Sequence, residues 1–176
     1  MKRIPGLVAG LVTALALLTA GCTAFDEQPA PSPTSAPASA APTPTFTDVS
    51  RGDTESVVKL LKYDARALAV VVEPTVFLDG TTFCTAFGIP GTDPRCERSW
   101  VTEDSKTKVT LPVTTRAKLL TVRDGDPECI DERTGAGACL WDPAELARRT
   151  APADGILVRL TTEDGTATRI AEVYLP

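Results

Sequence analysis

Residues 156–175 carry the sequence ILVRLTTEDGTATRIAEVYL, which holds the clearest secondary-structure pattern in the chain. Two runs rich in apolar and β-branched residues, at 156–161 and 167–175, flank the dipeptide Asp164-Gly165. Asp-Gly between two such runs is a strong signal for a two-residue hairpin turn. We therefore predict that the chain closes with an antiparallel β-hairpin.

A second hairpin is predicted nearer the N-terminus. Residues 56–62 form a β-rich run, residues 63–66 carry a turn signal, and residues 67–72 resume the apolar pattern. Residues 76–78 extend this second arm to a predicted turn at Asp79-Gly80. Pro74 interrupts the arm, which predicts a bulge or an edge position because proline cannot donate a ladder hydrogen bond.

The segment between these hairpins predicts two more strands and a helix. The strands are expected at 109–113 and 118–122, separated by Thr114 and Thr115. Asp142-Pro143 supplies an N-cap and a first helical residue, and the helix is expected to end near Arg149. The fold predicted is mainly β: a small antiparallel barrel or curled sheet with one short helix, to which an OB-like barrel is a possible analogue.

Five cysteines occur in the chain, and four of them lie in the predicted β domain: Cys84, Cys96, Cys129 and Cys139. We favour the pairs Cys84–Cys96 and Cys129–Cys139 because each lies within one Gly/Pro/Asp-rich segment, although three connectivities are possible. Each bridge would stabilise the fold by about 3 kcal/mol. No zinc site is expected, because the chain has no histidine and no Cys-x-x-Cys spacing.

The fifth cysteine, Cys22, follows a segment typical of an export signal. Lys2 and Arg3 precede an apolar run at 7–18 that is too short for a comfortable membrane span. The sequence Leu-Thr-Ala-Gly-Cys at 18–22 resembles a bacterial lipobox, which implies cleavage before Cys22 and a lipid (palmitate-type) anchor on that cysteine. We predict a signal peptide at 1–21 and a location at the cell membrane, on its extracytoplasmic face.

The predicted domain order is a signal peptide, a linker at 22–47 and a globular β domain at 48–176. Of the 20 residues at 28–47, 18 are Pro, Ala, Ser or Thr, a composition that cannot bury enough apolar surface to fold. Removing the signal peptide leaves 16 basic against 23 acidic residues and a net charge of −7. This acidic balance argues against a nucleic-acid partner.

Three segments resemble a group of small secreted proteins and lipoproteins of Gram-positive bacteria whose function is uncharacterised. They are residues 63–80, residues 99–113 and the C-terminal run 164–176. The absence of His and Asn, with Arg outnumbering Lys, fits an actinobacterial source. The resemblance implies a single extracytoplasmic domain and carries over no catalytic residues.

The chemistry-bearing residues are few. Without histidine, the usual serine and cysteine nucleophile pairs are excluded, so we expect no catalytic site and no cofactor. An acidic loop contains the hard oxygen ligands that calcium prefers, with Asp124, Asp126 and Glu128 as candidates and Asp131 and Glu132 beyond them. A solvated acidic loop is the favoured interpretation, and a calcium-assisted or carboxylate-based envelope enzyme is the alternative function.

Three aromatic residues complete the set of candidates. Trp100 and Trp141 lie near the cysteine loops, where packing against a disulfide is favoured over an exposed anchor for a partner. Tyr174 is expected to pack in the core or at a sheet edge. The function predicted is a membrane-anchored lipoprotein, held to the membrane through lipid on Cys22, whose β domain binds a protein or small ligand at the cell envelope.

Overall fold

The computed structural model describes residues 43–152 and 154–176. The predicted signal peptide, Cys22 and the linker up to residue 42 lie outside the described residues. The described part is mainly β, as predicted, and contains nine strands and two α-helices. The helices have eight and seven residues, so neither of them is long enough to span a membrane.

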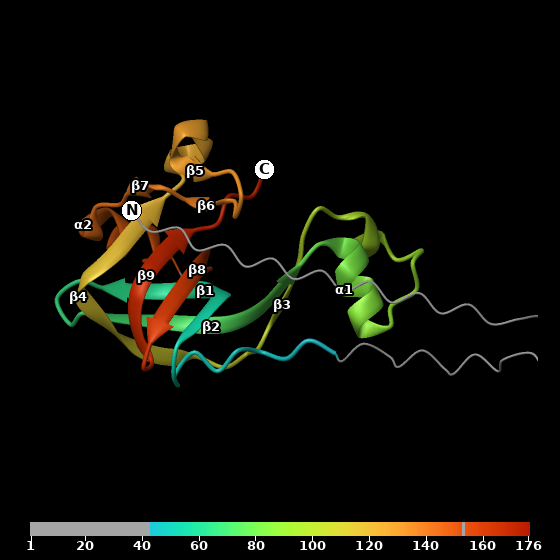
Figure 1. The fold of residues 1–176 in the computed structure, drawn as a ribbon, viewed down its shortest axis with the longest axis horizontal. Coiled ribbons are helices and arrows are strands. Elements are labelled where there is room, and N and C mark those ends of the chain that lie inside the picture. The colour runs from blue at the N-terminus through green and yellow to red at the C-terminus, as the bar shows by residue number, and fades with distance from the viewer. Residues whose placement is uncertain (1–42, 153) are drawn as a thin grey trace, which may run out of the picture. The chain divides into compact units, whose positions relative to one another are not determined.

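Five strands form a closed ring (Figure 1). The ring strands are β1 (Thr54–Asp64), β2 (Ala69–Leu78), β4 (Val109–Thr121), β8 (Ile156–Glu163) and β9 (Thr166–Glu172). Strand β1 pairs with β2 and β8, β9 joins β8 to β4, and a β2–β4 pairing closes the circle. Both predicted hairpins are therefore present, and one helix precedes the last two strands of the ring, which is the placement on which the OB-like analogy was based.

One pairing departs from the antiparallel arrangement expected. Strands β4 and β9 run parallel, with Leu119 opposite Ile170. Strand β4 is also continuous where two strands were predicted. Thr114 and Thr115 do not end it, because threonine is β-branched and fits a strand; instead the β4–β9 register shifts between Val113 and Lys118.

The hydrophobic core fills the inside of the ring. Alternate residues of each strand point inward, and Leu60, Leu160 and Ile170 are fully buried. Each such side chain contributes about 1.5–3 kcal/mol of burial free energy. Helix α2 (Pro143–Arg149) adds the fully buried Leu146 to the same core. Asp142 caps this helix, as predicted, by accepting hydrogen bonds from the amides of Ala144 and Glu145 at 2.8 and 3.1 Å.

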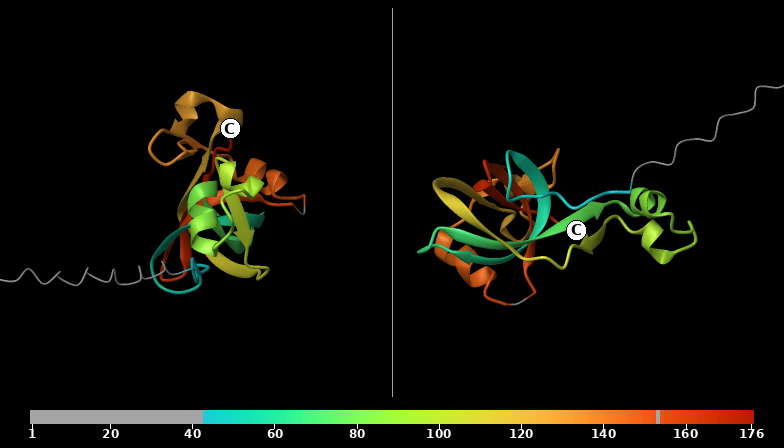
Figure 2. Two further views of the ribbon diagram at one scale, coloured as in Figure 1. Left: turned by 90° about the vertical axis from the view of Figure 1, so that its right-hand side faces the viewer. Right: turned by 90° about the horizontal axis from the view of Figure 1, so that it is seen from below.

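Strand β2 extends beyond its pairing with β4 and carries a separate lobe (Figures 1 and 2). Its first half pairs with β4 and its second half with β3 (Val101–Asp104). Pro74 lies between the two pairings, where a missing amide donor is tolerated. Of the two predicted alternatives, the edge position fits this side of β2, whereas the bulge does not: Pro74 is in register with Val58, and the β1–β2 register shifts between Leu60 and Lys62.

The lobe contains a second helix where a turn was predicted. Helix α1 (Gly80–Phe87) begins directly after Asp79, and the 3-10 helix η1 (Pro94–Glu97) packs beside it. Asp79 is an N-cap, since its carboxylate accepts a hydrogen bond from the amide of Thr82 at 2.9 Å. The expectation of one helix and of a turn at Asp79-Gly80 is therefore wrong.

A flap of short elements follows β4. It contains η2 (Arg123–Gly125), η3 (Pro127–Cys129), the hairpin β5 (Ile130–Asp131) and β6 (Ala136–Gly137), and β7 (Cys139–Leu140). The flap packs on the outside of the ring, where Ala136 buries Leu120 and Ala171. Both favoured disulfides are confirmed: Cys129–Cys139 closes the flap, and Cys84–Cys96 closes the lobe.

Candidate functional site

An open cleft of about 400 Å³ lies where β8 begins and β9 ends, and we name it the main cleft. Its lining is mixed. The charged residues Lys59, Asp124, Arg149 and Glu172 lie beside an apolar set made of Val122, Ile156, Leu157, Val173, Tyr174 and Leu175. Volumes in this range accommodate small organic ligands, which usually bind against apolar walls with a few polar groups for orientation.

A smaller space of about 230 Å³, the side cleft, adjoins the main cleft. Asp124, Arg149 and Glu172 line both spaces, so the two meet at these residues. The side cleft continues to Leu140, whose side chain is 81% exposed, and to the buried Trp141.

A strained turn forms one wall of the main cleft. Arg123, Asp124 and Gly125 have consecutive positive φ angles of 45°, 58° and 90°. Two non-glycine residues in this region cost free energy, and such strain persists only where the surroundings fix it. The ring of Tyr174 packs against Gly125, where a Cβ atom would lie 3.0 Å from Cε2 of the tyrosine.

Glu172 holds the start of this turn. Its Oε2 atom accepts hydrogen bonds from the hydroxyl of Thr121 at 2.7 Å and from the amide of Val122 at 3.1 Å. The Thr121 hydroxyl oxygen in turn accepts a bond from the amide of Arg123 at 3.0 Å. This network connects the end of β9 to the end of β4 and places Asp124 over the cleft.

The flap supports the same wall from behind. Gly137 lies against the backbone of Thr121, where a Cβ atom would be 2.7 Å from the carbonyl carbon. The amide of Tyr174 donates a hydrogen bond to the carbonyl of Gly135 at 2.8 Å. The C-terminal segment that lines the main cleft is therefore fixed by the flap, which the Cys129–Cys139 disulfide closes.

The charged groups around the main cleft differ in whether they already form an ion pair. Lys59 forms an ion pair with Asp104 of β3. Burial raises the pKa of Asp104, but hydrogen bonds from Lys59 and Thr75 outweigh that effect and bring the pKa below its usual value. Arg149 and Asp124 take part in none of the four ion pairs between described residues, so both charges are available to a ligand.

The predicted calcium candidates do not converge in the structure. Asp126 accepts a hydrogen bond from the amide of Glu128 at 3.1 Å, and the Glu128 side chain is exposed. Asp131 accepts bonds from the amide and hydroxyl of Thr134, which lower the pKa of its carboxyl. Within residues 43–152 and 154–176, no group of three or more Asp, Glu or Cys side chains is arranged to hold a metal ion. Only Asp124 reaches a cleft.

The aromatic candidates have three different environments. Trp141 is buried in the ring core, and its amide donates to the carbonyl of Leu119 at 2.9 Å. Trp100 is half-buried and stacks on Phe77 with 6.4 Å between ring centroids. Tyr174 is 37% exposed at the rim of the main cleft, so its expected role in core or edge packing is only part of its environment.

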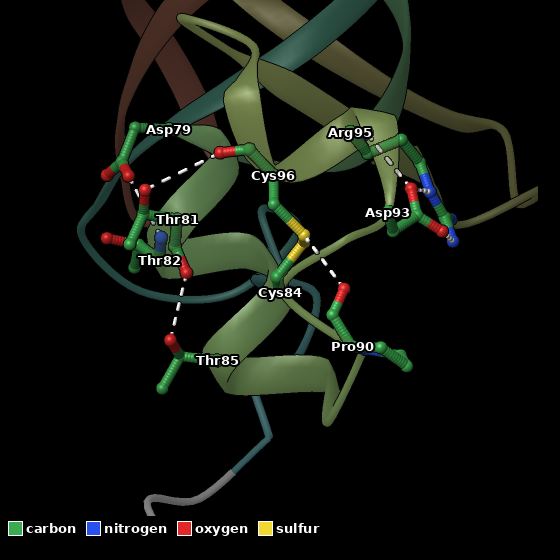
Figure 3. Close-up of a disulfide and its surroundings, with 9 residues drawn as sticks. All are labelled: Asp79, Thr81, Thr82, Cys84, Thr85, Pro90, Asp93, Arg95 and Cys96. Carbon is green, nitrogen blue, oxygen red and sulfur yellow. Dashed lines mark hydrogen bonds and ion pairs between the residues drawn. A yellow bond between two sulfur atoms is a disulfide. The ribbon is translucent and has the colours of Figure 1, made fainter.

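The lobe is a second surface to consider (Figure 3). Figure 3 shows the Cys84–Cys96 bridge with the hydroxyls of Thr81 and Thr85 on the α1 side and Pro90 opposite them. A hollow of about 390 Å³ lies along this bridge. Its lining has a single charged residue, Glu97, and lacks the strained, multiply braced wall of the main cleft. We therefore regard the main cleft as the better candidate site.

The sequence singled out Asp124 only as a calcium candidate and Tyr174 only as a packing residue, and it assigned Lys59, Arg149 and Glu172 to no binding site. Arg149 was recognised only as the end of a helix, and Glu172 only as part of a strand. No local pattern marks these residues, since their common position depends on pairing between distant strands. The two adjoining hollows are visible only in the folded chain.

No protein-family model, curated protein or solved structure matches this chain. The interpretation of the main cleft therefore rests on its own geometry, and the resemblance to small Gram-positive lipoproteins stays a prediction.

Proposed function

We propose that this protein is a lipid-anchored extracytoplasmic lipoprotein whose β domain binds a ligand or a protein segment at the cell envelope. The sequence around Cys22 supports the anchor, and the Pro/Ser/Thr/Ala-rich linker supports display away from the membrane. The observation that carries the binding role is the main cleft, a hollow of about 400 Å³ that both apolar and charged side chains line. The proposal includes no catalytic step.

The anchor is tested by labelling growing cells with an alkyne-bearing fatty acid. The full-length protein should take up the label and fractionate with membranes, whereas the Cys22→Ala variant should do neither. Label on the Cys22→Ala variant, or an unlabelled wild-type protein, would contradict the lipid anchor.

The binding role is tested by photo-crosslinking in intact cells. A photoreactive residue at position 174, on the rim of the main cleft, is compared with the same residue at the exposed position Thr115 on β4. We expect adducts that recur at position 174 and are absent at position 115, identified by mass spectrometry. Equal adduct patterns at the two positions would contradict a ligand site in the main cleft.

A further inference from the structure

We propose that the main and side clefts together bind an amphipathic cation, that is, an ammonium or guanidinium group joined to an apolar group. This inference rests on the proposed binding function and names the ligand class of the same site. Three independent observations carry it: the charges of the lining, the exposed face of Tyr174, and the division of the site into an apolar and a polar part.

The lining charges favour a cation. The carboxylates around the two clefts belong to Asp124, Asp142, Glu145 and Glu172. The bases are Lys59, Arg123 and Arg149, and the Lys59 ammonium is already neutralised by Asp104. A ligand therefore meets four negative charges and two available positive ones. This excess of negative charge disfavours an anionic ligand and gives a cation charge complementarity.

Tyr174 adds a separate contribution. Its ring packs on one side against Gly125 and remains 37% exposed at the rim of the main cleft. The face of an aromatic ring attracts an ammonium or guanidinium group, by about 0.5–1 kcal/mol at exposed sites. An aromatic ring in a cleft that carboxylates also line favours a cationic ligand over an anionic one.

The apolar part of the ligand is inferred from the main cleft. Ile156, Leu157, Val173 and Leu175 supply apolar side chains to the lining there, while the side cleft is lined mostly by polar side chains. Asp124 lies at the junction of the two spaces. A ligand with its apolar group in the main cleft would place its cation near Asp124, between the tyrosine ring of the main cleft and the Glu145 carboxylate of the side cleft. Two sources supply this chemistry: a free amphipathic amine, or a basic side chain of a peptide.

The experiment uses residues 22–176 with Cys22→Ser, which leaves no site for the proposed lipid. The isotope-labelled protein is titrated with three probes of similar shape: phenethylamine, phenethyl alcohol and hydrocinnamate. Amide signals of Gly125, Leu157 and Tyr174 report on the main cleft, and that of Gly91 in the lobe is the internal control. We expect phenethylamine to bind most tightly, phenethyl alcohol less tightly and hydrocinnamate least.

Charge variants test the cause of the preference. Asp124→Asn combined with Glu145→Gln should weaken phenethylamine about fivefold, the size expected for two exposed charges, and leave phenethyl alcohol unchanged. The matched control, Glu163→Gln with Asp164→Asn, removes two exposed charges at the hairpin turn, at the opposite end of β8 and β9. This control should leave the affinity for phenethylamine unchanged.

A further pair of probes distinguishes the two sources. Acetyl-leucyl-lysine amide is compared with acetyl-leucyl-glutamine amide and with phenethylamine. Tighter binding of the lysine peptide than of both others assigns a peptide side chain, and tighter binding of phenethylamine assigns a free amine. Hydrocinnamate binding as tightly as phenethylamine, or equal weakening by the control variant, would overturn the inference while leaving a ligand site in place. If no probe shifts the main-cleft signals, the proposed function itself fails.

Discussion

Single contacts decide how the wall of the main cleft is built, and glycine makes two of them possible. At Gly125 the absence of a side chain admits the ring of Tyr174, and at Gly137 it admits the backbone of Thr121. A backbone neighbour cannot move aside as the end of a flexible side chain can. The position of Gly137 is therefore the more restrictive of the two.

The first prediction concerns Gly137→Ala. A Cβ atom at this position would lie 2.7–2.9 Å from three backbone atoms of Thr121, so the flap must shift away from β4. We expect a loss of about 1–3 kcal/mol in the free energy of unfolding, measured by urea denaturation. Gly91→Ala is the control, because nothing lies within 4 Å of its Cβ position. Equal stability of the two variants would contradict the close packing of the flap.

The residue scale also explains why the candidate site was only partly predictable. Asp124 stood out as one of several carboxylates in an acidic loop, but its neighbours in space come from β9 and α2. Glu172 is 50 residues beyond Val122, whose amide it binds. Sequence patterns report on neighbours along the chain. They could therefore mark Asp124 as a candidate carboxylate but could not show which distant residues surround it.

Among the elements, α1 shows where local signals mislead. Asp79-Gly80 is a turn dipeptide, yet here Asp79 is the N-cap and Gly80 the first residue of a helix. Glycine is needed at this position because the carbonyls of η1 approach too closely for a side chain. Helix propensity is low across a segment that contains three threonines. Two sequence features do indicate the helix. Gly88 ends it with a φ of 64°, and the rings of Phe83 and Phe87, one helical turn apart, lie 4.6 Å from each other between centroids.

A second prediction follows for the lobe. Removing its disulfide with Cys84→Ala and Cys96→Ala should unfold α1 and η1 while the ring stays folded, because the ring core contains no residue of the lobe. Hydrogen exchange should speed up at the amides of α1 and stay slow in β1 and β8. Loss of protection in the whole ring would contradict the independence of the lobe.

Helix α2 provides a third prediction, one that sequence analysis already supports. Asp142→Ala should lower the free energy of unfolding by about 1 kcal/mol, since the amides of Ala144 and Glu145 lose their acceptor. Asp142→Asn should retain most of the stability, because asparagine is an equally good cap. The comparison is made by thermal unfolding, and a destabilised Asn variant with an unaffected Ala variant would refute the capping role.

For the whole molecule, the sequence predicted the hairpins and not the ring. The β1–β2 and β8–β9 hairpins each join strands that are adjacent in the chain. Both hairpins were predicted from the apolar pattern of their strands and from their turn residues, such as Asp164-Gly165. Closure depends on β2 meeting β4 and on β4 lying parallel to β9, with Leu119 opposite Ile170. Such distant pairings leave no periodic signal, which is why barrel and curled sheet remained equal alternatives.

The charge distribution of the whole molecule leads to the last prediction, on acid stability. The folded state lowers the pKa of several carboxyls from the usual value of 3.8, through hydrogen bonds at Asp79 and Asp131 and, at Asp104, through bonds from Lys59 and Thr75 that outweigh burial. A carboxyl whose pKa is lower in the folded state stabilises the fold above pH 3.8, and this contribution is lost as pH falls through the folded value. The chain has no histidine, so no such group adds a transition near neutrality. We expect the urea midpoint to be nearly constant from about pH 8 to about pH 5 and to fall steeply below about pH 4.

The variant Asp104→Asn separates this contribution from general acid effects. It should cost about 2 kcal/mol at neutral pH, because Lys59, whose side chain is only 28% exposed, loses its charged partner. The same variant should be less sensitive to acid than the wild type, since the group that titrates has been removed. Glu163→Gln, which removes an exposed carboxylate outside the four ion pairs, should follow the wild-type curve. If Asp104→Asn loses as much stability as the wild type between neutral pH and about pH 3, the ion pair between ring and lobe does not contribute to acid sensitivity.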